Sequence, residues 1–281
     1  MTSAADVLRD AAAQLNVAGI ESARLEARLL LAHILKISPD ELITGGRAID
    51  ANVHAAFTAL LNRRLGHEPL AYIVGTKEFW SLPFAVGPGA LIPRPETELM
   101  IELALIQYAD HNAPLRALDL GTGSGCILIA FLSAFPHATG VGIDISEQAL
   151  HWARQNAQMN NVAGRCHFTL GDWAHDVTEK FDVIFTNPPY IDNAGMATLA
   201  PDVKDHEPGL ALFGGADGLA SYGALAPHIA NHLAPKGYAF IEMGMGQAVA
   251  IEQIMAGAGL KTRHIAPDMA GIERCLVLGH Q

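Results

Sequence analysis

From about residue 96 to its end, the chain alternates short apolar runs with longer helical stretches. The apolar runs include RALDL, TGVGIDIS, RCHFTLGD, FDVIFTN and GYAFIEMG, and CILIAFLSAF and EQALHWARQNAQMN stand between the first of them. Strands and helices at this spacing predict a parallel sheet covered by helices on both faces. The last two runs, LKTRHIAPD and ERCLVLGH, are separated by little more than MAGI, which predicts an antiparallel hairpin at the end of the sheet. The expected fold class is α/β.

The first third of the chain has a different pattern. Apolar residues recur at helical spacing from residue 3 to about residue 75, and breaks at residues 16–19, 38–40 and 45–46 divide them into short helices. Between residues 66 and 93 glycine, proline and aromatic residues take over, and the alternation in FWSLPFAV predicts a hairpin that turns near Ser81, Leu82 and Pro83. We therefore expect an N-terminal helical-bundle domain (residues 1–75), a β-hairpin linker (76–95) and an α/β domain (96–281).

The composition of the chain limits which partners the protein can bind and where in the cell it is expected. Lys and Arg number 18 against 29 Asp and Glu, a formal net charge of -11, whereas proteins of long nucleic acids usually carry a basic stripe. The longest apolar stretch, residues 126–135, is shorter than the roughly 20 residues that span a bilayer. The 3 cysteines and 13 histidines show no metal-ligand spacing. We expect a cytoplasmic protein without a metal, without direct nucleic-acid or membrane binding and, because heptads are lacking, a monomer.

A glycine-rich loop, GTGSGC, directly follows RALDL and precedes a helix. Open α/β sheets bind ligands beyond the carboxyl ends of their strands, where glycines let backbone N–H groups approach the ligand. The pattern is G-x-G-x-G, because Cys126 stands where a dinucleotide fingerprint requires a third spaced glycine. The next strand ends at Asp144, whose carboxylate can accept both hydroxyls of a ribose. The alternatives are a tight turn without a ligand and an acid that favours a helix N-terminus.

The third strand ends in Asp172 and Trp173. A carboxylate can accept a hydrogen bond from an exocyclic amine, and an indole can pack on an adenine ring. Because these features follow three successive strands, together they predict one groove shaped for an adenosine.

This series of motifs resembles the class I S-adenosylmethionine-dependent methyltransferases. The resemblance implies a Rossmann-like sheet of seven strands with the last one antiparallel. It also implies S-adenosyl-L-methionine as cofactor and S-adenosyl-L-homocysteine as product. The expected cofactor-binding residues are Gly121, Thr122, Gly123, Ser124, Gly125, Asp144, Asp172, Trp173 and Asn187.

The segment NPPY, residues 187–190, follows the fourth strand. Proline has no N–H, so this segment is stiff and its carbonyl oxygens stay available. The side-chain oxygen of Asn187 and the carbonyl of Pro188 can hold the two hydrogens of a planar NH2 group, aim its nitrogen at a methyl donor and stabilise the developing positive charge. Tyr190 can pack against the flat face of that group. The alternative is an ordinary proline-rich turn.

NPPY in this setting is shared by methylases of adenine or cytosine amino groups and by methylases of glutamine side chains. The whole sequence resembles the protein-glutamine methyltransferases of peptide chain release factors, the PrmC/HemK family. The matching motifs are LIPRPETE, DLGTGSG, GIDIS, GDW, FDVIFTNPPYI and EPGLALFGGADGL. The resemblance implies methylation of the glutamine side-chain nitrogen (N5) in the Gly-Gly-Gln motif of class 1 release factors, which modulates translation termination. It assigns catalysis to Asn187, Pro188 and Tyr190, adds Pro189 to them for substrate binding, and gives the helical domain the contact with the release factor.

Several acidic and basic residues allow two interpretations. Arg94 and Glu96 are candidates for lining the cofactor pocket, but Glu96, together with Glu98, is also what a helix N-terminus favours. A structural role is favoured for Glu207, Asp217 and Glu242. Two other functions stay open from the sequence: an amino-group methylase of DNA or RNA, and a non-catalytic binding protein that keeps the methyltransferase fold.

Overall fold

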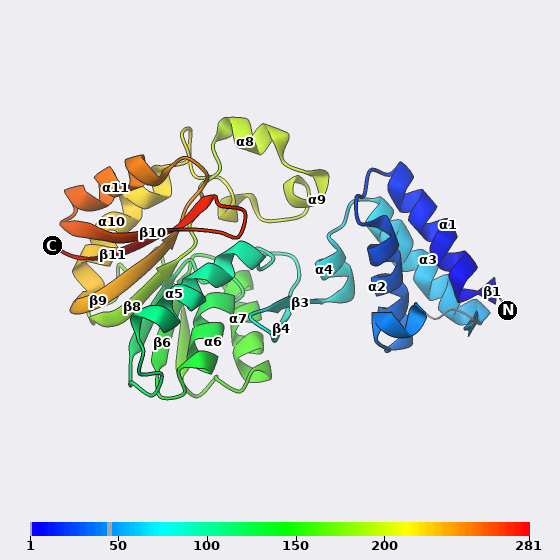
Figure 1. The fold of residues 1–281 in the computed structure, drawn as a ribbon, viewed down its shortest axis with the longest axis horizontal. Coiled ribbons are helices and arrows are strands. Elements are labelled where there is room, and N and C mark those ends of the chain that lie inside the picture. The colour runs from blue at the N-terminus through cyan, green and yellow to red at the C-terminus, as the bar shows by residue number, and fades with distance from the viewer. Residues whose placement is uncertain (1, 44–46) are drawn as a thin grey trace. The chain divides into compact units, whose positions relative to one another are not determined.

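The computed structural model describes residues 2–43 and 47–281 and divides into two compact units (Figure 1). The smaller unit comprises the residues up to Gly75 together with Pro201–His206, and the larger one comprises Thr76–Ala200 and Glu207–Gln281. The hairpin expected as a linker is thus counted with the larger unit. The expected break at residues 45–46 lies outside the described residues.

The smaller unit is a bundle of short helices. Its first two helices end at Val17 and Leu35, next to the breaks expected at residues 16–19 and 38–40. Apolar side chains of α1, α2 and α3 form its core, which includes Leu15, Leu30 and Phe57. The sequence did not suggest a two-residue strand pair. The elements are β1 (Thr2–Ser3), α1 (Ala4–Val17), α2 (Ala23–Leu35), η1 (Pro39–Leu42), β2 (Ala48–Ile49), α3 (Ala51–Leu65), α4 (Leu70–Val74) and α9 (Pro201–Lys204).

Arg64 is a buried cation in the core of this unit, with 5% of its surface exposed. Its Nε donates to Glu26 Oε2 at 2.5 Å, and its Nη2 lies 3.6 Å from Asp202 Oδ2. A buried charge without a partner would be costly. The two carboxylates therefore tie α3 to α2 and to α9, a segment distant in sequence.

A seven-stranded sheet forms the centre of the larger unit, in the order β10-β11-β9-β8-β5-β6-β7. Strands β5 to β9 pair in parallel, whereas β11 is antiparallel to both of its neighbours. The expected α/β fold, with the last strand antiparallel, is confirmed. The strands are β5 (Arg116–Leu120), β6 (Thr139–Asp144), β7 (Cys166–Leu170), β8 (Phe181–Thr186), β9 (Leu233–Glu242), β10 (Leu260–Pro267) and β11 (Glu273–His280).

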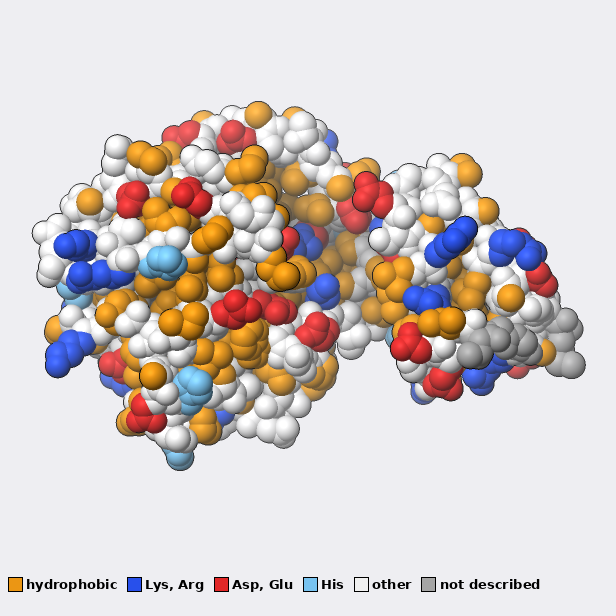
Figure 2. All heavy atoms as spheres, in the orientation of Figure 1, with side chains coloured by type: hydrophobic (Ala, Val, Ile, Leu, Met, Phe, Trp, Pro, Cys, Tyr) orange, Lys and Arg blue, Asp and Glu red, His pale blue; other side chains and the backbone are white. Residues whose placement is uncertain are grey.

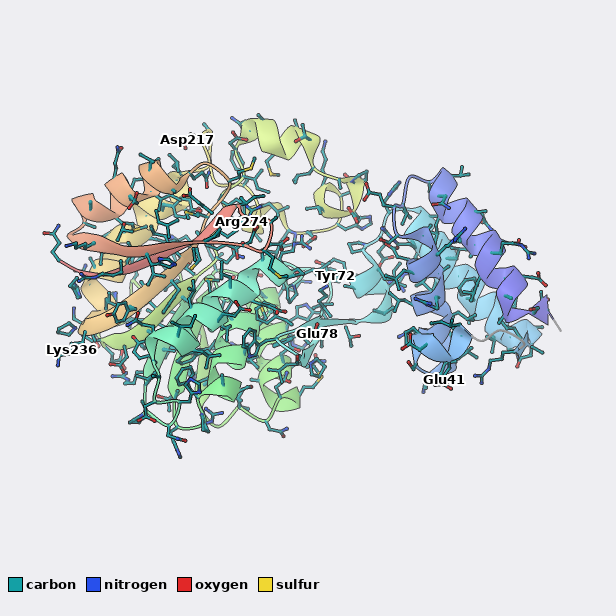
Figure 3. All side chains as sticks on the ribbon, in the orientation of Figure 1. Glu41, Tyr72, Glu78, Asp217, Lys236 and Arg274 are labelled. Atoms are coloured by element: carbon teal, nitrogen blue, oxygen red, sulfur yellow. The ribbon has the colours of Figure 1, made fainter. Side chains whose placement is uncertain are left out.

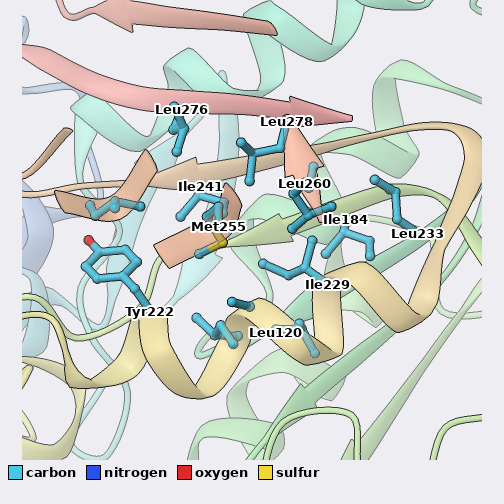
Figure 4. Packing of buried hydrophobic residues seen from close by; sticks show 14 of the residues in the cluster. Leu120, Ile184, Tyr222, Ile229, Leu233, Ile241, Met255, Leu260, Leu276 and Leu278 are labelled. Carbon is cyan, nitrogen blue, oxygen red and sulfur yellow. The ribbon is translucent and has the colours of Figure 1, made fainter. Parts of the chain in front are cut away.

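Helices cover both faces of this sheet (Figure 1). Side chains alternate between the faces of a strand, so Leu120 and Ile184 join a core cluster with α10 and α11 (Figure 4). Phe185 points to the other face, where its ring lies 5.3 Å from that of Phe131 on α6. The helices are η2 (Pro95–Glu98), α5 (Leu99–Gln107), α6 (Cys126–Ala134), α7 (Glu147–Met159), α8 (Asn193–Thr198), η3 (Gly209–Ala211), α10 (Ala220–His232) and α11 (Ala248–Gly257).

The hairpin consists of β3 (Thr76–Phe79) and β4 (Leu82–Ala85). Its turn is Trp80-Ser81, earlier than expected, and Leu82 and Pro83 belong to the second strand. Both turn residues have positive φ angles, 53° and 57°, as the preferred two-residue hairpin turn requires. The Trp80 N–H donates to Glu98 Oε1 at 2.9 Å, and the Ser81 N–H to Glu78 Oε1 at 2.5 Å. These bonds stabilise a backbone conformation that side chains other than glycine disfavour.

Three observations bear on the expectations from composition. Among residues 2–43 and 47–281, no helix is both long enough and apolar enough to cross a membrane. No group of three or more His, Cys, Asp or Glu in the described part of the chain could hold a metal ion. Cys126 and Cys275 are buried free thiols, and burial raises the pKa of Cys126 to about 12, so Cys126 packs as an apolar side chain.

Candidate active site

A cavity of about 500 Å³ lies beyond the carboxyl ends of β5, β6, β7 and β8. This volume falls within the roughly 300–1,000 Å³ usual for small-molecule sites. Its lining brings together most of the residues that the sequence singled out. The lining comes from residues 89–94, Thr97, residues 121–124, Cys126, Ile127, residues 143–146, Gln148, Ala149, residues 171–173, Asn187, Pro189, four residues between 208 and 213, and Ser221.

The glycine loop after β5 is held by the end of β6. Gly121, Gly123 and Gly125 all have positive φ angles, between 56° and 79°, which only glycine adopts without strain. The N–H groups of Gly121 and Thr122 both donate to the Ile143 carbonyl at 2.9 Å. The N–H groups of Gly123 and Gly125 also donate to acceptors of the protein. These four N–H groups are therefore bonded within the loop and to β6 and its end, and residues 121–124 of the loop line the cavity.

Gly123 and Gly125 serve different purposes in this loop. A Cβ atom at Gly123 would meet no atom of the protein within 4 Å, so this glycine leaves room in the cavity. A Cβ at Gly125 would lie 3.1 Å from the Cβ of Ala153 on α7. Gly125 therefore allows the loop to pack closely against a helix.

Asp144 lines the cavity and also organises the loop. Its Oδ2 accepts from the Gly123 N–H at 2.8 Å and its Oδ1 from the Ser146 N–H at 2.9 Å. Burial raises the pKa of this carboxyl, and the backbone hydrogen bonds oppose that rise. Each carboxylate oxygen has a second lone pair, so ribose binding and support of the α7 N-terminus are compatible.

Asp172 and Trp173 follow β7 and line the same cavity. Trp173 has a φ angle of 52°, rare for a bulky side chain. A Cβ built on Gly121 would lie 3.7 Å from Trp173 Cζ3, so the indole lies against the glycine loop. Its binding to an adenine ring stays a prediction.

The NPPY segment is divided between the cavity and the interior. Asn187 and Pro189 line the cavity, whereas Pro188 and Tyr190 are not among the lining residues. The Tyr190 hydroxyl donates to Glu242 Oε1 at 3.4 Å, and burial raises the pKa of Tyr190 to about 12. Within the described residues, no donor reaches the side-chain oxygen of Asn187 or the Pro188 carbonyl. Asn187 Oδ1 is thus an available acceptor at the cavity, whereas Pro188 is buried and not part of the lining.

Loop 212–218 packs against the backbone of the NPPY segment, and this close approach requires two of the glycines in EPGLALFGGADGL. A Cβ at Gly214 would lie 2.7 Å from the Pro189 carbonyl oxygen, and one at Gly218 would clash with the Tyr190 carbonyl oxygen. The side-chain amide of Gln247 also donates to the Tyr190 carbonyl at 3.1 Å. Asp217 Oδ1 accepts from the Leu219 N–H at 3.0 Å, a structural turn as expected.

Arg94 and Glu207 join two walls of the cavity. Arg94 Nη2 lies 2.6 Å from Glu207 Oε1, and the other Glu207 oxygen accepts from the Ile92 N–H at 3.0 Å. The Glu207 side chain is 1% exposed. Arg94 is a lining residue, whereas Glu96 is exposed and outside the lining.

The sequence did not single out Thr97, Asn156 or a link from Glu242 to the site. Thr97 lines the cavity, and its hydroxyl connects Asn187 to the buried carboxylate of Glu242. Asn156 on α7 bonds both backbone groups of Ala85 and the Ser124 carbonyl, which joins the hairpin to the glycine loop. Thr97 stands within LIPRPETE, but nothing local indicates either set of partners.

The cavity fits the cofactor that the resemblance implied. Asp119 Oδ1 and Ser124 Oγ are buried and have no partner among the described residues, although buried polar atoms normally have one. Ser124 lines the cavity, and Asp119 bonds the lining residue Thr122 at 2.6 Å. Burial raises the pKa of Asp119 to about 7. Ser124 Oγ is thus an unpaired polar atom at the wall of a largely apolar cavity, as suits a ligand that hydrogen-bonds there.

Comparison with known proteins identifies relatives along nearly the whole chain. The PrmC N-terminal domain matches residues 6–75 and a methyltransferase domain matches residues 111–249. A release factor glutamine methyltransferase from Rhodospirillum rubrum is 42% identical over 94% of this chain and 81% of its own. One from Cereibacter sphaeroides is 42% identical over 96% of both chains. A methyltransferase structure from Pyrococcus furiosus shares the fold, with a TM-score of 0.53 and 19% identity over 79% of this chain and 98% of its own. The chain therefore belongs to the release factor glutamine methyltransferase family.

Proposed function

We propose that this protein transfers a methyl group from S-adenosyl-L-methionine to the N5 side-chain nitrogen of the glutamine in the Gly-Gly-Gln motif of class 1 peptide chain release factors. Membership of the family supports this activity. The observation that carries it is the available side-chain oxygen of Asn187, a residue that lines a cavity suited to the cofactor.

The cofactor is proposed to bind along the ends of β5, β6 and β7. Residues 121–125 would leave room for its methionine end, and Asp144 would accept hydrogen bonds from the ribose. Asp172 and Trp173 would hold the adenine through its amine and its flat face. All but Gly125 of these residues line the cavity.

The acceptor nitrogen is proposed to be held by the NPPY segment. A glutamine side chain presents two N–H hydrogens, which Asn187 Oδ1 and the Pro188 carbonyl would accept. These oxygens would fix the direction of the nitrogen and stabilise positive charge as it develops there. Tyr190, whose hydroxyl bonds Glu242, would limit the movement of the amide by packing.

The bound cofactor supplies a methyl group on a positively charged sulfur, which makes that methyl electrophilic. For this reason no residue near Asn187 has to remove a proton from the amide before transfer, and the proton can leave afterwards. The task of the protein is to position the nitrogen and exclude water.

The partner is proposed to be the release factor alone. The domain of residues 1–75 would bind it away from the reacting loop, with the hairpin of residues 76–95 leading to the catalytic residues 96–281. A net charge of -11 disfavours long nucleic acid, and on the face in Figure 2 acidic and basic side chains are interspersed. We propose a monomer that acts in the cytoplasm, where release factors work, and modulates translation termination.

Labelled S-adenosylmethionine tests this function. The protein is incubated with a class 1 release factor, with the same factor carrying Gly-Gly-Ala, and with mixed DNA and RNA. We expect label on the first substrate alone. Equal labelling of the Gly-Gly-Ala factor would refute the proposed site, and label on an adenine would instead identify an amino-group methylase of nucleic acid. Calorimetry with the cofactor gives a separate check, since a non-catalytic binding protein need not bind it.

A further inference from the structure

A relay of two hydrogen bonds runs from Asn187 to a buried carboxylate. Asn187 Nδ2 donates to Thr97 Oγ1 at 3.2 Å, and Thr97 Oγ1 donates to Glu242 Oε2 at 2.5 Å. Thr97 and Glu242 are each 3% exposed. The Thr97–Glu242 bond is therefore shielded from water and stronger than it would be at the surface, and the Asn187–Thr97 bond is partly buried.

The direction of this relay follows from the chemistry of its members. Above the pKa of about 7 to which burial raises it, Glu242 is an ionised carboxylate that only accepts, and a hydroxyl has one proton to donate. The Thr97 proton is therefore used on Glu242, and the remaining lone pairs of Thr97 can only accept. Asn187 must then present its NH2 group to Thr97, which leaves its oxygen for the cavity that Asn187 lines.

The positions of the strands bring the relay together. β8 and β9 pair in parallel with Thr186 opposite Ile241, so the following residues, Asn187 and Glu242, emerge side by side at the same edge of the sheet. Thr97 comes from η2, 90 residues before Asn187. The other oxygen of Glu242 accepts from Tyr190. The Glu242 carboxylate is therefore bonded directly to the last residue of NPPY and, through Thr97, to the first.

An isolated carboxylate is expensive to bury, and an apolar side chain would pack at this position without that cost. Arg274 on β11, labelled in Figure 3, favours the charged form of Glu242, but its guanidinium bonds Asp268 at 3.2 Å. Among the described residues, the Glu242 carboxylate accepts hydrogen bonds from Thr97 and Tyr190. Tyr190 belongs to the NPPY segment, and Thr97 bonds its first residue, Asn187.

We propose that Thr97 and Glu242 are positioning residues, which lock the Asn187 amide with its oxygen toward the substrate. This inference rests on the proposed function, because the orientation matters only for a substrate that presents an NH2 group. Without the Thr97 hydroxyl the amide can turn over and present its own NH2 to that of the substrate. The two NH2 groups would then repel each other, and the substrate nitrogen would lose its hydrogen bond to Asn187 Oδ1.

Two substitutions at Thr97 separate orientation from packing. Thr97→Val removes the hydroxyl and keeps the shape of the side chain, whereas Thr97→Ser keeps the hydroxyl. We expect kcat to fall roughly tenfold or more in Thr97→Val, less than the roughly 100- to 1,000-fold typical of losing a direct contact, and to stay within about threefold of the wild type in Thr97→Ser. In an Asn187→Ala background, Thr97→Val should cause no further loss. Equal losses of kcat in Thr97→Val and Thr97→Ser would overturn the relay. So would a full further loss of kcat when Thr97→Val is added to Asn187→Ala.

The relay is also observable without turnover, which separates its failure from failure of the proposed function. In 15N-labelled protein, the side-chain NH2 resonance of Asn187, assigned by its disappearance in Asn187→Asp, should exchange slowly with water. Its exchange should accelerate in Thr97→Val and remain slow in Thr97→Ser. If it does not change in Thr97→Val, the relay is wrong whatever substrate the wild-type protein methylates.

Discussion

The glycine loop and the NPPY segment follow two neighbouring strands, β5 and β8, but they are held in different ways. The main support of the glycine loop comes from the end of β6, only 21 residues later in the chain. The NPPY segment is held by Thr97, 90 residues earlier than Asn187, and by Glu242 and Gln247, more than 50 residues later than Tyr190. One half of the site is therefore built largely by local sequence, and the other is assembled by the fold as a whole.

The largest effect is expected when the NPPY half loses its central side chain. Asn187→Ala removes one acceptor for the substrate nitrogen, so kcat for methyl transfer should fall roughly 100- to 1,000-fold. Affinity for S-adenosylhomocysteine, measured by calorimetry, should fall far less, because the glycine loop remains intact. Parallel losses in kcat and in affinity would mean that the two halves are not separable.

Asn156 joins the glycine loop to the hairpin at Ala85, 71 residues earlier in the chain, and removing it tests how local the support of that loop is. Asn156→Ala leaves Ala85 N–H, Ala85 C=O and Ser124 C=O without their buried partner, so the free energy of unfolding should fall by about 3 kcal/mol. Urea titration followed by tryptophan fluorescence measures it, because all three tryptophans belong to the larger unit.

Asn160→Ala is the matched control for Asn156→Ala. Asn160 follows the same helix, is half-buried and also bonds the hairpin, through an exposed hydrogen bond to the Pro83 carbonyl. We expect it to cost less than about 1 kcal/mol. Equal costs would assign the effect to the loss of any asparagine that contacts the hairpin.

Glu242, which supports the NPPY segment, makes the free energy of unfolding depend on pH. Burial raises the pKa of this carboxyl from 4.5 to about 7. Between these values the folded protein binds more protons than the unfolded chain, so stability falls as the pH rises through this range. Glu242→Gln removes the effect, and its free energy of unfolding relative to the wild type should improve by up to about 3 kcal/mol between pH 4.5 and pH 8.

The same replacement at exposed Glu102 on α5 controls for the loss of one acidic side chain. Urea titrations of the two variants and the wild type at both pH values provide the comparison. A difference between Glu242→Gln and the wild type that does not change with pH would show that burial does not hold the Glu242 carboxyl protonated below pH 7.

The smallest effect tests the glycine loop itself. Gly123→Ala should weaken binding of S-adenosylhomocysteine about tenfold, because its Cβ would project into the cavity rather than against protein. Gly19→Ala is matched to it: Gly19 also has a positive φ angle and no atom within 4 Å of its Cβ, but it lies in the smaller unit. Both should lose about 1 kcal/mol of stability from backbone strain. Only Gly123→Ala should lose affinity.

The same difference explains what could be predicted from the sequence. The parallel sheet with its terminal antiparallel hairpin and the cavity-lining residues 121–124, Asp144, Asp172 and Trp173 followed from periodicity and from motifs at strand ends, which are local signals. Thr97 and Asn156 were missed because their partners lie 90 and 71 residues away, and no pattern in one sequence relates such positions. Glu242 was interpreted as structural, since a single acidic residue at the end of a strand does not reveal that it bonds both Thr97 and Tyr190. The hairpin turn was misplaced because Trp80 and Ser81 adopt positive φ angles that their residue types disfavour.

The most direct test of the account is to locate the methyl group within the modified release factor. After reaction with S-adenosylmethionine, tandem mass spectrometry of the peptide that contains Gly-Gly-Gln determines which residue and which atom are modified. We predict a single added methyl group on the side-chain nitrogen of that glutamine. A methyl group on another residue, or an unmodified peptide with label elsewhere in the mixture, would contradict the assignment of Asn187 and Pro188 to a glutamine amide.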